Sequence, residues 1–153
     1  MASQPGASRG FTLVELLVVI AIVGLLAAMA VSSLTSAIQR GRQKRTMGDM
    51  HTLGAAIQAY QIDFARFPAV TGNASQLTAV LTPTYLKTLP AVDGWNRPIQ
   101  YAGGPTGYTL ISWAADGTPT TPYRFGPTTA FSDDIVFVDG QFAQWPEGMQ
   151  ASR

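Results

Sequence analysis

An apolar run near the start of the chain is the feature that most constrains how the chain can fold. Residues 11–31 read FTLVELLVVIAIVGLLAAMAV. As a helix with a rise of about 1.5 Å per residue, this run would be roughly 30 Å long, which is the thickness of a membrane's hydrocarbon core. A secretory signal peptide would instead carry a shorter apolar region followed by a small-residue cleavage site. We therefore expect a membrane-spanning helix.

One acidic residue, Glu15, lies within this run, and no basic residue accompanies it there. An ionised carboxylate at the middle of a membrane helix costs about 2.5 to 3.5 kcal/mol on insertion scales, so it indicates a functional contact with a partner. A second interpretation stays open, because Glu15 is only one turn inside the run. From there the helix dipole and the nearby headgroups would reduce the cost of the charge.

Residues 10–15, GFTLVE, followed by the apolar run, resemble the processing motif of type IV prepilins and type II secretion pseudopilins. The resemblance implies that a prepilin peptidase cuts between Gly10 and Phe11 and methylates the new amino group of Phe11. It also implies that Glu15 meets the cationic N-terminus of a neighbouring subunit during assembly. Such a pair would relieve the cost of both charges in a medium of low dielectric constant.

Three segments follow from these features: a leader at residues 1–10, a transmembrane or filament-core helix at 11–31, and one domain at 32–153. Apolar residues continue at helical spacing beyond the span, which predicts an amphipathic helix to about residue 66, ended by Pro68. This apolar stripe consists of Met47, Met50, Leu53, Ile57, Tyr60 and Phe64.

The remainder of the chain consists of short segments separated by glycine and proline. Short runs rich in apolar and aromatic residues predict strands at 99–102, 108–112, 135–138 and 141–145, with turns at 103–107 and 139–140. A short helix is expected at 74–81, capped by Asn73. The sequence therefore predicts an α+β fold, in which a long N-terminal helix packs on a small antiparallel sheet, as the resemblance to pilins and pseudopilins also implies.

The composition argues against several classes of function. Charged residues make up 12% of the chain and the net charge is +1, so binding to nucleic acid has little electrostatic support. Cysteine is absent, which excludes a disulfide framework and a thiolate nucleophile. His51 is the one histidine, expected on a helix surface, and no phosphate-binding or HExxH motif occurs, so we expect no enzymatic activity.

Three later segments extend the resemblance towards the major pseudopilins of type II secretion. They are residues 89–98 (LPAVDGWNRP), 112–117 (SWAADG) and 133–135 (DDI). In that family the last loop holds a calcium ion, which implies Asp116, Asp133 and Asp134 as ligands here. Ca²⁺ takes six to eight oxygen ligands from carboxylates and carbonyls, so these residue types are suitable. The alternative is three solvated acids.

The resemblance as a whole implies a structural subunit of a type II secretion pseudopilus, which polymerises from the inner membrane to drive export of folded proteins. Its implied partners are further copies of itself in a helical homopolymer, the prepilin peptidase, the inner-membrane platform and ATPase, minor pseudopilins, and the membrane before assembly. Two alternatives remain: a subunit of a surface type IV pilus, or a membrane-anchored calcium-binding module that never polymerises.

Charges around the span give a conflicting indication of its orientation. Basic residues follow it at Arg40, Arg42, Lys44 and Arg45, whereas Arg9 alone precedes it. The positive-inside rule would then place residues 32–153 in the cytoplasm. The resemblance implies the reverse, a single-pass inner-membrane protein whose C-terminal domain is periplasmic, and we give the processing motif more weight.

Overall fold

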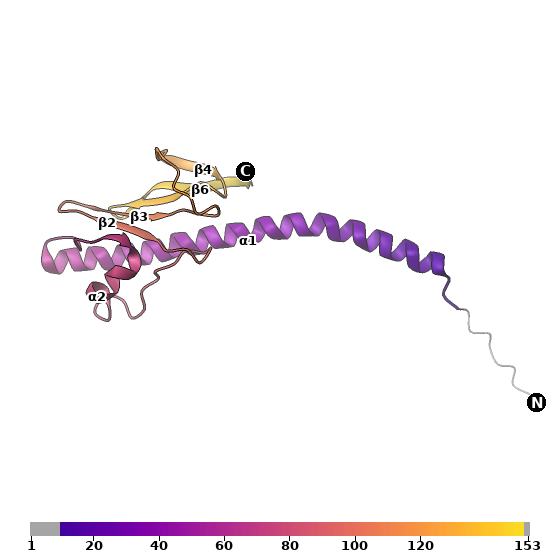
Figure 1. Ribbon diagram of the computed structural model, residues 1–153, viewed down its shortest axis with the longest axis horizontal. Helices are drawn as coiled ribbons and strands as arrows, with labels where there is room; N and C mark the ends of the chain where they lie inside the picture. Colours follow the sequence, from indigo (N-terminus) through magenta and orange to yellow (C-terminus); the bar gives the residue numbers. More distant parts are fainter. Residues whose placement is uncertain (1–9, 152–153) are drawn as a thin grey trace, which may run out of the picture. The chain divides into compact units, whose positions relative to one another are not determined.

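The computed structural model describes residues 10–151, so all but the last residue of the expected leader lies outside the described part. These residues belong to two compact units, one ending at Thr35 and the other beginning at Ser36. Figure 1 shows the elements. In chain order they are α1 (Leu13–Phe64), β1 (Thr71–Asn73), the 3₁₀-helix η1 (Ala74–Leu77), α2 (Thr78–Leu81), β2 (Gln100–Gly103), β3 (Tyr108–Ser112), β4 (Gly126–Ala130), β5 (Ile135–Val138) and β6 (Gln141–Ala151).

The first unit is the apolar start of α1. The large apolar side chains of this unit are exposed along the whole segment, from Phe11, just before the helix, at 74% to Val31 at 62%. By length and composition, α1 is the one helix in the described part of the chain that could cross a membrane. A helix that is apolar on every side needs lipid or other helices around it. The expected membrane-spanning segment is therefore present as a helix.

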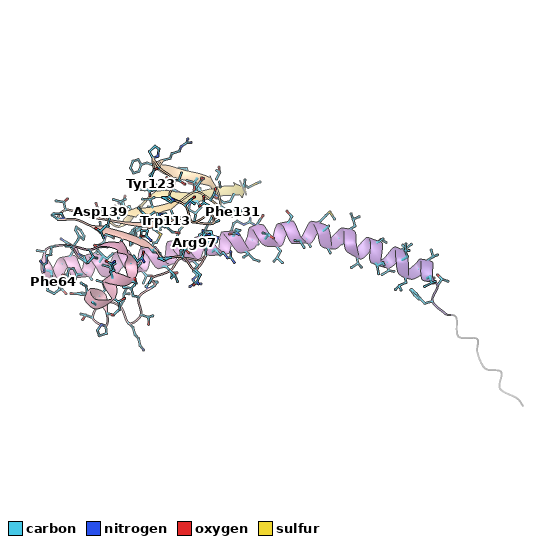
Figure 2. All side chains as sticks on the ribbon, viewed as in Figure 1. Phe64, Arg97, Trp113, Tyr123, Phe131 and Asp139 are labelled. Atoms are coloured by element: carbon cyan, nitrogen blue, oxygen red, sulfur yellow. The ribbon has the colours of Figure 1, made fainter. Side chains whose placement is uncertain are left out.

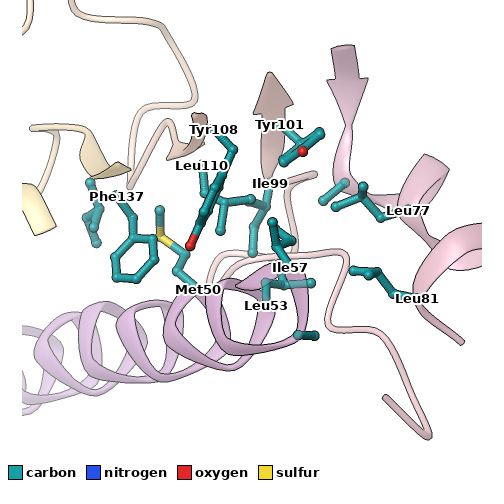
Figure 3. Packing of buried hydrophobic residues seen from close by; sticks show 13 residues of the cluster. Met50, Leu53, Ile57, Leu77, Leu81, Ile99, Tyr101, Tyr108, Leu110 and Phe137 are labelled. Atoms are coloured by element: carbon teal, nitrogen blue, oxygen red, sulfur yellow. The ribbon is translucent and has the colours of Figure 1, made fainter. Parts of the chain in front are cut away.

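In the second unit, α1 lies along one face of the sheet, and the core forms between them (Figure 3). Met50, Leu53 and Ile57 of α1 are fully buried against the sheet residues Leu110 and Phe137. The packing leaves no space beside Gly54, because a methyl group there would overlap the Phe137 ring. The predicted apolar stripe is confirmed except at its end, where Phe64 is 54% exposed and stacks on Tyr60.

The helix ends two residues earlier than the expected boundary at about residue 66. Its last residue is Phe64, because Ala65 adopts a left-handed conformation with φ 51° and cannot continue the helix. Pro68 follows after a short connection and accepts a hydrogen bond from the Tyr101 hydroxyl at 2.8 Å. The apolar stripe therefore predicted the position of the helix, whereas the backbone conformation of Ala65 determines where the helix ends.

The sheet has the order β1-β2-β3-β5-β6-β4. The four expected strands are confirmed, and β6 extends to Ala151. The Asp139-Gly140 turn has φ of 48° and 94°, the positive pair that a two-residue hairpin requires. The expectation of a purely antiparallel sheet was wrong in one pair, because β4 runs parallel to β6.

Two strands and one cap differ from the expectation. β1 and β4 were not predicted, since both contain glycine and neither shows alternating apolar residues. Asn73 precedes η1 and α2, which together replace the single expected helix, but its side chain makes no cap. Its Oδ1 instead accepts a hydrogen bond from Gln100 Nε2 at 3.1 Å, because β1 and β2 are neighbours.

Candidate functional site

Glu15 occupies the first turn of α1, where it forms a reciprocal pair with Thr12. Its Oε2 accepts hydrogen bonds from the Thr12 amide and the Thr12 hydroxyl, both at 2.9 Å. In return, the Glu15 amide donates to Thr12 Oγ1 at 3.2 Å. This is a capping box, in which a threonine before the helix and an acid three residues later satisfy each other's amide groups. In a single copy of the chain, the carboxylate is therefore engaged locally.

The capping role of Thr12, which lies within the motif at residues 10–15, was not predicted from the sequence, although the T-x-x-E spacing could have revealed it. The cap fixes where α1 begins and holds Glu15 beside the segment Gly10-Phe11 that precedes the helix. Phe11 is 74% exposed, and Gly10 is exposed as well. The predicted cleavage, methylation and inter-subunit pairing stay predictions.

The three predicted calcium ligands lie on two turns that the fold brings together. We call residues 113–134 the acid loop, since they include Asp116, Asp133 and Asp134. A backbone hydrogen bond from Ala115 N to Phe131 O, at 3.1 Å, joins the turn that carries Asp116 to the turn that carries the other two acids. Residues distant in sequence thus become neighbours. Figure 2 labels Trp113, the first residue of this loop, and Phe131, which lies in the turn with Asp133 and Asp134.

The three acids have different surroundings. Asp116 is exposed, and its carboxylate accepts hydrogen bonds from the Thr118 amide and hydroxyl. Asp133 Oδ2 accepts from Ala130 N at 3.1 Å. Asp134 is fully buried: its Oδ2 accepts from Thr120 N at 2.9 Å, whereas its Oδ1 has no hydrogen-bond partner. Burial raises the pKa of Asp134 to about 6, helped by the negative charges of Asp116 and Asp133.

A buried carboxylate oxygen without a partner is the feature here that fits a bound cation. The donors are all oxygens, as Ca²⁺ requires. Within residues 10–151, however, no three His, Cys, Asp or Glu side chains converge into a group that could hold a metal by themselves. Calcium would therefore have to recruit carbonyl or hydroxyl oxygens of the acid loop. A pocket of about 340 Å³, open to solvent, lies beside Asp133 and Thr120.

A second buried acid, Asp93, organises the segment 89–98 that was noted in the sequence. Its Oδ1 accepts from the amides of Trp95 and Arg97, both at 2.9 Å, and its Oδ2 accepts from Ser112 Oγ at 2.7 Å. Arg97 then donates from Nη1 to Ala114 O at 2.5 Å, and its guanidinium group lies close to Gly117. Asp93 therefore connects this segment to the acid loop.

Comparisons with known proteins match two parts of the chain. Residues 6–31 match the prokaryotic N-terminal methylation motif, and residues 33–124 match the family described as type II secretion system protein G. The type II secretion system core protein G of Pseudomonas aeruginosa is 36% identical over 122 residues, which cover 71% of this chain and 84% of that protein.

Two further relatives carry the same description. The core protein G of Dickeya chrysanthemi is 27% identical over 144 residues, covering 92% of this chain and 88% of the relative. That of Escherichia coli is 32% identical over 122 residues, covering 71% of this chain and 83% of the relative. No solved structure matches the chain.

Proposed function

Since the chain belongs to the protein G family of type II secretion systems, we propose that it is the structural subunit of a pseudopilus that grows from the inner membrane and moves folded proteins outwards. One observation carries this proposal: a methylation motif at residues 6–31 adjoins a protein G domain at 33–124 in a single chain. The same match favours secretion over a surface pilus and over a module that never polymerises.

The assembly step depends on the exposed apolar part of α1. Before assembly, lipid surrounds the side chains from Phe11 to Val31, and in a filament the same faces of neighbouring copies replace the lipid. Each copy then presents different surfaces to the copies above and below. Such head-to-tail contacts do not close on themselves, so one kind of subunit can build a filament of any length.

Glu15 supplies the specific contact within this apolar assembly. We expect its carboxylate to exchange the Thr12 amide and hydroxyl for the methylated amino group of Phe11 on a neighbouring copy. The Thr12 contacts show that the carboxylate already faces the N-terminal end of its own helix. After cleavage, the N-terminal end of each helix carries a positively charged amino group. The Glu15 carboxylate of one copy would then pair with the amino group of Phe11 on its neighbour, and the pair would reduce the cost of placing each charge in the membrane.

Processing of the leader gives the first test. We expect Gly10→Val to keep residues 1–10 on the protein and to leave Phe11 unmethylated, because a branched side chain at the cleaved bond obstructs the peptidase. Intact-mass measurement of protein from cells with an active prepilin peptidase would detect both changes. Ala7→Val, which adds a branched side chain elsewhere in the leader, should be processed normally. Wild-type protein that retained its first ten residues would contradict the proposal.

We also propose that the acid loop binds Ca²⁺ through Asp116, Asp133 and Asp134, with the remaining ligands drawn from backbone or hydroxyl oxygens. The support is the partnerless oxygen of buried Asp134 and the raised pKa of its carboxyl group. A bound cation would supply the positively charged partner that Asp134 Oδ1 lacks. It would also link the two turns of the acid loop and so stabilise the folded domain.

Calcium should therefore raise the thermal midpoint of the protein. At a concentration a hundred times Kd, binding to the folded state alone adds about 2.7 kcal/mol, which corresponds to a rise of roughly 10 °C for a domain of this size. Tryptophan fluorescence in excess calcium and in chelator would measure it. Equal midpoints in the two conditions would exclude the site.

The variant Asp134→Asn distinguishes an effect on calcium binding from an effect on the stability of the fold. Removing a buried negative charge should leave the protein in chelator at least as stable as wild type, while the calcium-dependent rise disappears. Asp139→Asn is the matched control, since Asp139 lies in the β5–β6 turn and its Oδ1 accepts from Tyr108 N. That variant should keep the full response to calcium.

A further inference from the structure

The C-terminal strand β6 carries a buried glutamine that bridges two distant parts of the acid loop. Gln144 is 3% exposed. Its Oε1 accepts a hydrogen bond from Arg124 N at 2.8 Å, and its Nε2 donates to Asp134 O at 2.8 Å. Both partners are main-chain groups. One side-chain amide therefore fixes the backbone of the acid loop at its middle and at its end.

The loop segment that contacts this glutamine has little regular structure of its own. Residues 118–125 contain no helix or strand, and they are followed by β4, which pairs with β6. Thr120 N donates to Asp134 Oδ2, so the same segment also covers the buried carboxylate. Gln144, Thr120 and Asp133 all line the pocket of about 340 Å³. The position of residues 118–125 thus depends on a few polar contacts from β6 and Asp134.

β6 is itself attached firmly enough to act as a support. Gln150 Nε2 donates to Thr128 O of β4 at 2.7 Å, and Gln150 Oε1 accepts from the buried Gln43 of α1 at 3.2 Å. On its other side, β6 pairs with β5. The strand is therefore linked to the helix, to β4 and to the central sheet. A hydrogen bond from a β6 side chain to the acid loop therefore fixes that loop relative to the sheet and to α1.

We propose that Gln144 is a positioning residue that keeps the acid loop closed over Asp134 before any ion binds. The chain has no cysteine, so no disulfide can close this loop. The residues that follow the matched protein G domain, in particular β6, then have a function: they hold the two turns that carry the acids in place. The consequence for calcium affinity rests on the proposed calcium site, whereas closure of the loop by Gln144 does not.

Trypsin gives a direct measure of loop closure, because Arg124 is the one lysine or arginine between residues 98 and 152. Gln144→Met keeps the length of the side chain and removes both amide groups. In full-length protein in detergent with chelator, we expect release of the fragment 125–153 to be at least tenfold faster in this variant. Gln141→Met, an exposed position on the same strand, should be cut at the wild-type rate.

Hydrogen exchange of the unaltered protein provides a measurement that requires no variant. With chelator present, the Arg124 amide should exchange as slowly as amides of β5, because Gln144 accepts its hydrogen bond. Exchange of the Arg124 amide at the rate expected of an exposed amide without a hydrogen bond, or equal tryptic rates for Gln144→Met and wild type, would overturn the proposal.

The two proposals can fail separately. If calcium slows cleavage at Arg124 in Gln144→Met, ligand binding and the glutamine close the same loop, as proposed. If calcium changes neither the thermal midpoint nor the cleavage rate of any variant, the calcium site is wrong. A tenfold difference between Gln144→Met and Gln141→Met in chelator would still support the positioning role.

Discussion

Replacing Glu15 by glutamine should abolish filament assembly and protein export while leaving the chain in the membrane. Glutamine serves a capping box as well as glutamate does, so the start of α1 and its contacts with Thr12 should persist. The change removes only the negative charge. A subunit added to the filament would then bury its neighbour's charged amino group without a partner, which costs about 3 to 5 kcal/mol.

That cost corresponds to a decrease of at least a hundredfold in the binding of each added subunit, because 1.4 kcal/mol is a factor of ten. The measurement is filament yield and export of a secreted protein in a strain whose own copy is deleted. Membrane fractionation provides the control for insertion, which should improve without the charge. Glu15→Asp, which keeps the charge on a shorter side chain, should retain part of the activity.

A second control separates the cap from the charge. Thr12→Val removes the hydroxyl that caps α1 and leaves Glu15 ionised. Losing a cap costs about 1 kcal/mol at the end of one helix, so assembly should be weakened and not abolished. Normal filaments from Glu15→Gln together with their loss from Thr12→Val would show that the cap, and not the charge pair, is what assembly needs.

The sequence predicted those elements whose signal is local. The apolar run and stripe located α1, and Asp139-Gly140 located the β5–β6 turn, because helical spacing and left-handed turn residues act over a few positions. β4 gave no such signal: it contains Gly126 and Pro127 and exists as a strand because β6 offers it a parallel partner. Long-range pairing of this kind is not encoded in a short window of residues.

The site residues divide in the same way. Gly10, Phe11 and Glu15 form one contiguous motif, and the capping role of Thr12 was visible in its spacing from Glu15. The bridge from Gln144 to Arg124 and Asp134 joins residues 10 and 20 positions apart, and nothing in the local sequence marks that glutamine. The orphan oxygen of Asp134 is likewise a product of packing, since only the folded loop removes water from it.

The largest loss of stability from one substitution should follow from Asp93→Ala. Asp93 is 1% exposed, and its carboxylate accepts three hydrogen bonds, from the Trp95 amide, the Arg97 amide and the Ser112 hydroxyl. Alanine would leave these donors without a partner in a region closed to water. Hydrogen bonds to a charged group contribute about 1.5 to 3 kcal/mol each, and they are not additive within one network.

We therefore expect a loss of about 3 to 5 kcal/mol, a large fraction of the 5 to 15 kcal/mol that stabilises an ordinary domain. Unfolding in urea, followed by the fluorescence of the three tryptophans, would measure it. Asp93→Asn should cost less, because its oxygen can still accept from the two amides while the Ser112 hydroxyl turns to accept from the new NH₂ group. Asp63→Ala provides the exposed control, with one hydrogen bond from the Tyr85 hydroxyl and an expected loss below about 1 kcal/mol.

The same substitution should also affect the acid loop, because Asp93 positions Arg97, which donates to Ala114 O in that loop, and Ser112, the residue before the loop. Gly94 N donates to Thr46 Oγ1 at 2.8 Å, and a side chain at Gly94 would overlap the backbone of Arg42, so this segment is held against α1 without space to adjust. Once Asp93 is removed, Arg97 loses its orientation towards Ala114 O. Asp93→Ala should then weaken the response to calcium as well as the fold, whereas a stable Asp93→Ala protein would show that the hydrogen bonds of Asp93 are replaced by water.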